Sequence, residues 1–178
     1  MSIIKLQHVR LSFPSLFTTA LYNGKDTGKF KAAFILDKKK HRASIKEIED
    51  NMKKLAEDKL RGKLPPPTYL CLKDGDKTER PEYQGCMIVK TATKKRPLVL
   101  DKNKHPLTEQ DGIIYSGCYV NVLLSLWAQD NQHDKRVNAQ LEGVQFNEDG
   151  EPFGPAGIDI NEFDAFGSGD DTDDDLPF

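Results

Sequence analysis

The chain has 178 residues, of which 37% are hydrophobic and 30% charged. That is enough apolar material for one folded core, and it argues against a chain that is disordered throughout. No run of 18 apolar residues occurs, so a membrane-spanning helix is not expected. The N-terminus, which starts Met1–Lys5, has no apolar stretch long enough for a signal peptide. Cys71, Cys86 and Cys118 are widely spaced and form no CxxC motif, which favours a reducing cytosol over a disulfide framework or a cysteine-based zinc site.

Charge divides the chain into two unequal parts. Residues 1–146 hold all 26 basic residues and 17 of the 28 acidic ones, an excess of nine positive charges. Residues 147–178 hold the other 11 acids and no Lys or Arg. A basic body with an acidic end points to a polyanionic partner, and the alternative is a solubilising tail on an ordinary domain. Charge alone leaves both interpretations open.

The first part of the body is predicted to contain two strands and a connecting loop. Residues 3–13 form the first strand, which ends where Pro14 interrupts the ladder. Residues 14–27 are expected to form a loop that packs in part. Its apolar side chains are Phe17, Leu21 and Tyr22. Residues 29–36 form the second strand, because Phe30, Ala32, Phe34 and Leu36 alternate with a second set that includes Lys29 and Lys31.

A helix is predicted over residues 45–61. Ser44 and Glu47 have the spacing of a capping box, and Gly62 stands where a C-terminal cap belongs. The apolar stripe at helical spacing is Ile45, Ile48, Met52, Leu55 and Leu60. The lysines Lys46, Lys53, Lys54 and Lys59 lie mostly off this stripe, so a solvated face is favoured over a DNA site.

The second part of the body is predicted to be mostly strand. A short strand at 69–73 precedes a strand at 86–93, and two long strands at 117–129 and 136–146 form a hairpin with a polar tip. In residues 117–129 one face is apolar: Cys118, Val120, Val122, Leu124, Leu126 and Ala128. The other face is mixed: Tyr119, Asn121, Leu123, Ser125 and Trp127.

Five or six strands with one helix define a mainly β (α+β) domain. A five-stranded Greek-key barrel of the OB type, with extended hairpins, accommodates this inventory. We therefore expect an OB-type domain over residues 1–158 and a disordered acidic tail over residues 159–178.

The mixed face of the last hairpin and the basic residues near it form a candidate nucleic-acid site. Exposed aromatic rings on a sheet suit base stacking, and Lys and Arg neutralise phosphates. The candidate residues are Lys29, Lys31, Lys90, Lys94, Lys95 and Arg96 for phosphates, with Phe17, Tyr119 and Trp127 for bases. The alternatives are that the basic turn is merely solvated and that the rings form a minor core.

Motifs of catalysis or of cofactor binding are not found. The sequence contains no Gly-x-Gly-x-x-Gly, no Walker phosphate loop, no HExxH and no Gly-x-Ser-x-Gly. The four histidines are scattered and form no Cys–His set at zinc spacing. We therefore expect a binding protein without catalytic residues, metal or cofactor.

The acidic tail ends in a distinctive tripeptide. Proline limits its conformations, and a terminal Phe can place its ring in an apolar pocket while a basic residue pairs with its carboxylate. The residues expected to bind partner proteins are Asp170, Asp171, Asp173, Asp174, Asp175, Leu176, Pro177 and Phe178. The same acids can compete with DNA phosphates for the basic body.

Two parts of the sequence resemble known families. The ending DDDLPF at residues 173–178 resembles the acidic tip of bacterial single-stranded DNA-binding proteins, which recruits replication, recombination and repair proteins. The body resembles a bacteriophage family of single-stranded DNA-binding proteins long known only as a domain of unknown function. The matching stretches are VRLSFPSLF at 9–17, RPEYQG at 80–85, YSGCYV at 115–120 and GVQF at 143–146.

This resemblance implies an OB-fold, binding of single-stranded DNA with little regard to sequence, and no catalysis. It also implies recruitment of replication or recombination proteins by the tail, in the cytoplasm of an infected bacterium and without a membrane. The oligomeric state stays open. Two other functions remain as alternatives: an RNA-binding or chaperone-like regulator and, with less support, a metal-dependent nuclease.

Overall fold

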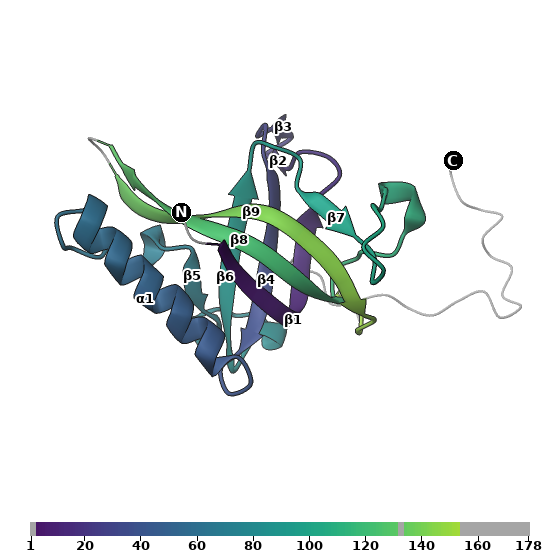
Figure 1. The fold of residues 1–178 in the computed structure, drawn as a ribbon, viewed down its shortest axis with the longest axis horizontal. Coiled ribbons are helices and arrows are strands. Elements are labelled where there is room, and N and C mark those ends of the chain that lie inside the picture. Colours follow the sequence, from purple (N-terminus) through teal and green to yellow (C-terminus); the bar gives the residue numbers. More distant parts are fainter. Residues whose placement is uncertain (1–2, 132–133, 154–178) are drawn as a thin grey trace, which may run out of the picture.

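The computed structural model describes residues 3–131 and 134–153 (Figure 1). Five long strands carry the fold. They are β1 (Ile3–Ser15), β4 (Phe30–Asp37), β6 (Cys86–Thr93), β8 (Tyr119–Asp130) and β9 (Lys135–Glu148). The short strands are β2 (Leu21–Tyr22), β3 (Lys25–Asp26), β5 (Leu72–Asp74) and β7 (Leu98–Leu100). The single α-helix described is α1 (Arg42–Lys59), and short 3-10 turns lie at Pro67–Tyr69, Gly75–Lys77, Pro81–Tyr83 and Glu109–Asp111.

The five long strands close into a barrel. Their order is β6-β4-β1-β8-β9, and these neighbours are all antiparallel. A parallel pairing of β6 with β9, in which Thr91 faces Ala139, closes the ring. Because β1, β4 and β6 follow one another and β8 returns to lie beside β1, the connection is a Greek key. The predicted five-stranded OB-type barrel is therefore confirmed.

Alternation along the strands fills the barrel. On β1, Ile4 and Leu6 are buried, and so are Val9 and Leu11 beyond the register shift between Leu6 and Val9; each pair has the period of two of a strand. Phe34 on β4 and Leu124 on β8 are also fully buried. The helix α1 packs against β8, β1 and β9 and adds Ile45, Ile48, Met52 and Ala56 to the same core. The predicted apolar stripe of α1 and the predicted inward face of residues 117–129 are thus confirmed. Ser125, expected on the outward face, is nevertheless buried, and its hydroxyl bonds Glu142 at 3.0 Å.

The start of α1 differs from the prediction. The helix begins at Arg42 with His41 as its N-cap and no side-chain capping bond, so the predicted capping box at Ser44 is wrong. The reason is local: the turn at 37–41 runs directly into the helix. The His41 N–H donates to the Asp37 carbonyl at 2.9 Å, and the His41 ring accepts the Asp37 N–H at 3.0 Å. At the other end, the Gly62 N–H bonds the Ala56 carbonyl at 2.8 Å, in keeping with a C-terminal cap there.

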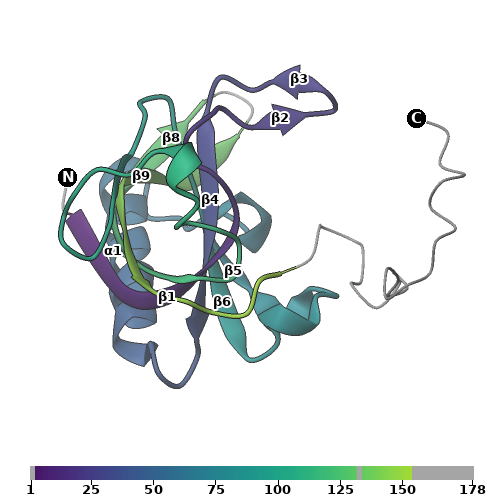
Figure 2. The same ribbon diagram turned by 90° about the vertical axis from the view of Figure 1, so that its right-hand side faces the viewer.

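Three predicted loop and strand assignments also change. The first strand, predicted to end at Pro14, continues to Ser15, because its register with β4 shifts between Ser12 and Ser15 and the pairing skips Phe13 and Pro14. Residues 14–27 contain the β2–β3 hairpin, which stands away from the barrel (Figures 1 and 2), and Leu21 and Tyr22 on it are exposed rather than packed. The short strand predicted at 69–73 lies instead at Leu72–Asp74, after a 3-10 turn at Pro67–Tyr69.

Two absences concern the residues that the structure describes. No helix within residues 3–131 and 134–153 is long and apolar enough to cross a membrane. Over the same residues no group of three His, Cys, Asp or Glu side chains is gathered as metal ligands would be. The three cysteines are free thiols, and burial raises the pKa of Cys71 to about 12.

Residues 149–153, which we call the strap, cross over Gly117 after β9 ends. Gly117 has φ +112°, and a Cβ there would overlap the Glu151 carbonyl and lie 2.8 Å from the Pro152 Cα. Replacing Gly117 with Ala should therefore lower the free energy of unfolding by about 3 kcal/mol or release the strap. Gly28, with φ +70° and open space around it, is the control, and its Ala variant should lose only about 1–2 kcal/mol. Urea denaturation of both variants measures this, and equal losses would contradict the packing argument.

Candidate nucleic-acid interface

The outward side chains of β4 and β6 form a continuous surface, which we call the β4–β6 face. Its members are Lys31, Ala33, Ile35, Ile88, Lys90 and Ala92. At one end Ile35 and Ile88 are covered by Tyr83 and Phe153, which form a small second core outside the barrel. Along the rest of the face, Lys31 and Lys90 are exposed and the residues paired with them are alanines. Small alanines between two lysines leave room for a ligand backbone to approach the sheet.

Further positive charge borders this face on the side of β5 and β9. Lys73 pairs with Ile88 in the register and so lies diagonally from Lys90. Partial burial, together with the positive charges of Lys90 and Arg136, lowers the pKa of Lys73. The Lys73 ammonium donates to the carbonyls of Pro67 and Thr68 at 2.9 and 2.7 Å. Three cations thus gather beside the β4–β6 face, and an anion bound among them would relieve their mutual repulsion.

Lys73 and Arg136 were not among the candidates from the sequence. Arg136 places its guanidinium carbon 4.6 Å from the centre of the Tyr69 ring, so an aromatic face accompanies the charge. Lys73 belongs to a strand whose alternation directs it outward, and that pattern was a usable signal. Arg136 comes near Lys73 because the segment before β5 bridges to β9, with Leu70 paired with Val137, and a single sequence does not reveal this long-range pairing.

A second group of basic residues, the basic end, marks the far end of β6. It consists of Lys29, Lys94, Lys95 and Arg96. The register aligns Phe30 with Thr93, so Lys29 and Lys94 are adjacent across β4 and β6, and all four side chains are exposed. Arg96 donates to the Phe17 carbonyl at 3.2 Å and lies 5.9 Å from the centre of the Phe30 ring. The structure therefore brings the basic candidates from the sequence to one face and its end.

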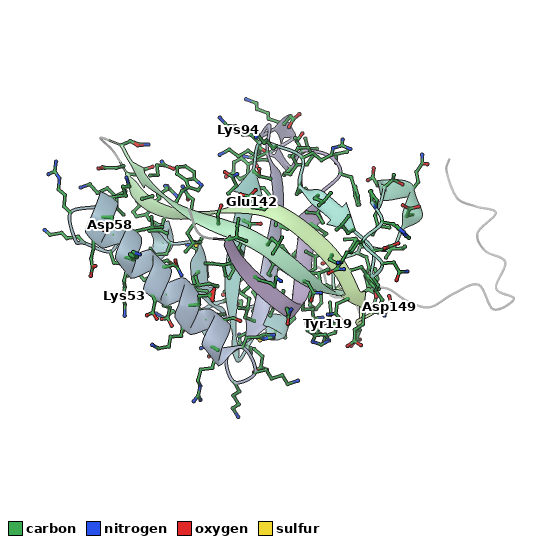
Figure 3. The ribbon with its side chains drawn as sticks, in the orientation of Figure 1. Lys53, Asp58, Lys94, Tyr119, Glu142 and Asp149 are labelled. Carbon is green, nitrogen blue, oxygen red and sulfur yellow. The ribbon has the colours of Figure 1, made fainter. Side chains whose placement is uncertain are left out.

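The three aromatic candidates lie in different surroundings. Trp127 is 39% exposed on the outer side of β8, opposite Asn138 on β9, near the tip of the β8–β9 hairpin. Phe17 is half-buried and packs against the barrel core. Tyr119 lies at the other end of β8 from Trp127, and Figure 3 shows it far from Lys94. Trp127 is the candidate ring with the most open surroundings.

Tyr119 belongs to a ladder of stacked cations and rings that holds the strap. His8 stacks on Tyr119 with ring centres 4.3 Å apart and planes 7° apart, so one face of the tyrosine is covered. Arg10 lies 5.9 Å from the Tyr119 ring and 4.1 Å from the Phe153 ring, and it also donates to the Glu151 carbonyl. Arg10 and Tyr119 come from two of the stretches that carry the family resemblance. In this structure both residues contact the strap, Arg10 at Glu151 and Phe153 and Tyr119 at Gly150.

The fold and this face define an OB-type barrel with a basic surface of the kind that accepts nucleic acid. The family model described as Enterobacter phage Enc34 ssDNA-binding protein matches residues 2–176, and the chain belongs to that family. The family is one of ssDNA-binding proteins and not of enzymes.

Individual relatives agree with this assignment. Protein p50 of Acyrthosiphon pisum secondary endosymbiont phage 1 is 39% identical over 171 residues, covering 90% of this chain and 92% of the relative. The single-stranded DNA-binding protein from bacteriophage Enc34 is 30% identical with a TM-score of 0.77, covering 90% of this chain and 88% of that one. The same Enc34 protein has been solved in complex with ssDNA, at 32% identity, TM-score 0.77 and coverage of 85% and 89%. Gp2.5, the single-stranded DNA-binding protein of bacteriophage T7, has a TM-score of 0.57 and 14% identity over 89% of this chain and 98% of that one, and it shares the fold.

Proposed function

We propose that this chain binds single-stranded DNA along the β4–β6 face, with little regard to base sequence, during phage DNA replication, recombination and repair. The observation that carries the proposal is the open stretch of this face. There Lys31 and Lys90 are each paired with an alanine, and Lys73 and Arg136 lie nearby. The solved complex of the Enc34 relative with ssDNA supports the choice of ligand.

The basic residues and the aromatic rings have separate roles in this proposal. Lys31, Lys73, Lys90 and Arg136 neutralise successive phosphates, and the basic end extends the same path along Lys29, Lys94, Lys95 and Arg96. Trp127 provides a stacking surface, which tolerates any base because every base has a π-face. Phe17 and Tyr119 remain weaker candidates for stacking, since the first packs on the core and the second is covered on one side by His8.

Fluorescence anisotropy with labelled oligo-dT, oligo-U and duplex DNA of equal length tests this function. We expect binding in the order oligo-dT, oligo-U, duplex, with log affinity falling linearly against log salt. A preference for oligo-U would support the RNA-binding regulator instead. Degradation of the single strand on adding Mg²⁺ or Mn²⁺ would support a nuclease.

Recruitment of replication or recombination proteins through the tail is the second part of the proposal. The tail residues, Asp170–Phe178, lie outside the described residues, so their sequence carries the argument: five aspartates precede Leu176-Pro177-Phe178. The strap ends at Phe153, which packs against Ile35 and Ile88 at the covered end of the β4–β6 face. Phe153 is the last described residue, so the described chain ends beside the proposed DNA site, and this supports competition between DNA and the acids that follow in the sequence.

Deleting residues 170–178 should tighten DNA binding severalfold at low salt, where charges are least screened, and abolish partner binding. Deleting Phe178 alone leaves every acidic side chain, so DNA affinity should stay near wild type while partner binding is lost. Titration of both variants with oligo-dT and with a phage or host replication protein measures this. Equal partner binding by wild type and the Phe178 deletion would rule out the anchor role, and unchanged DNA affinity in the longer deletion would rule out screening.

A further inference from the structure

The β2–β3 hairpin leaves two large apolar side chains in solvent. Leu21 is 69% and Tyr22 70% exposed, the highest values among large apolar side chains in residues 3–131 and 134–153. The hairpin projects beyond the barrel in both views (Figures 1 and 2). Hydrophobic side chains on a projecting two-stranded ribbon have no core to join, so their exposure needs another explanation.

Backbone hydrogen bonds fix the base of the β2–β3 hairpin, and a two-residue turn forms its tip. Asn23 and Gly24 have φ of 52° and 78°, as a two-residue type I′ turn requires. The Ala20 N–H donates to the Lys29 carbonyl at 2.7 Å, and the Thr27 N–H donates to the Ala20 carbonyl at 2.9 Å. These bonds tie the backbone of the hairpin to the residue that precedes β4, so the hairpin has a defined position relative to the barrel.

The two faces of the ribbon differ chemically. Residues paired directly across an antiparallel ladder point to the same side. Tyr22 pairs with Lys25, and Leu21 pairs with Asp26. One face therefore carries an aromatic ring beside an ammonium, and the other carries an aliphatic side chain beside a carboxylate.

The carboxylate on the second face stays ionised. Thr19 donates to Asp26 at 2.6 Å and the Gly28 N–H donates to it at 2.8 Å, and these bonds lower the pKa of Asp26. Its negative charge repels phosphate from the Leu21 side. A nucleotide is thus favoured on the Tyr22 side alone, where the ring can stack on a base and Lys25 can pair with a phosphate.

We propose that Tyr22 and Lys25 form a further nucleotide subsite, in which Tyr22 stacks on one base of the bound strand and Lys25 contacts its phosphate. This subsite rests on the proposed function, because it extends the path of the strand past the basic end. Lys29, at the root of the hairpin, joins the two regions through its bond with Ala20.

The test compares Tyr22→Ser with Leu21→Ser, a matched control of equal exposure on the opposite face. Stacking worth roughly 1–3 kcal/mol corresponds to a loss of about 5- to 150-fold in affinity for long oligo-dT. Leu21→Ser and Tyr22→Phe should bind like wild type, and oligo-dT too short to reach the hairpin should not distinguish any of them. Lys25→Ala should reduce the slope of log affinity against log salt by about 0.7.

The outcomes separate this subsite from the function itself. If wild type binds oligo-dT and Tyr22→Ser binds equally well at every length, the subsite is refuted while the function stands. Equal losses in Tyr22→Ser and Leu21→Ser would also refute it, since they would reflect a disturbed hairpin. Failure of the wild type to bind oligo-dT would overturn both proposals.

Discussion

Replacing Lys31, Lys73 and Lys90 together with alanine should lower the affinity for oligo-dT by about 100-fold at 0.1 M salt. Each phosphate contact on a single strand contributes about 0.7 to the slope of log affinity against log salt, so three contacts contribute about two log units at that concentration. The slope itself should fall by about 2. Lys31 and Lys90 are exposed on the β4–β6 face, and Lys73 lies beside Lys90, so the three changes leave the barrel core intact.

The matched control replaces Lys46, Lys53 and Lys54 on α1. These lysines are exposed, and Figure 3 shows Lys53 on the outer side of the helix, away from the barrel. The control removes the same net charge, so it measures how much of the loss comes from the general attraction of a basic body. Its slope should stay near that of wild type. Equal slopes for the two triple variants would show that the β4–β6 face is not the site.

Trp127→Ala should weaken oligo-dT binding by about 5- to 150-fold, the equivalent of roughly 1–3 kcal/mol for one stacked base. Trp127 is the only tryptophan in the chain, so its emission reports on that position alone. We expect saturating oligo-dT to quench this emission in the wild type.

Tyr119→Ala serves as the comparison for Trp127. Both rings lie on the outer side of β8, but Tyr119 is covered on one face by His8 and lies at the other end of the strand. We expect its removal to change oligo-dT affinity less than twofold. The stacking role would be contradicted if saturating oligo-dT left the Trp127 fluorescence unchanged and Trp127→Ala bound oligo-dT with wild-type affinity.

Much of the barrel could be predicted because its pattern is local. The alternation of apolar and polar residues predicted that Phe30 and Phe34 lie on one side of β4 and Lys31 on the other. The same pattern predicted an apolar and a mixed face for β8. The OB-type assignment followed from the number of such strands and the single amphipathic helix. The basic residues of the β4–β6 face were found for the same reason.

The parts that were missed depend on contacts distant in sequence. His8 covers Tyr119 because β1 and β8 pair with a register shift between Leu6 and Val9, and no local pattern encodes that shift. Arg136 comes near Lys73 because Leu70 pairs with Val137 on β9, a contact between residues far apart in the sequence. The β2–β3 hairpin is different, since its Asn23-Gly24 turn was a local signal. Its strands have only two residues each, too few for alternation to be recognised.

A crystal structure of the protein with a short oligo-dT tests the central claim most directly. The account predicts phosphates within about 4 Å of the ammonium groups of Lys31, Lys73 and Lys90, with the strand running toward the basic end. Density for the oligonucleotide on the outer side of β1 and β8, around Tyr119 and the strap, with the β4–β6 face empty, would contradict it.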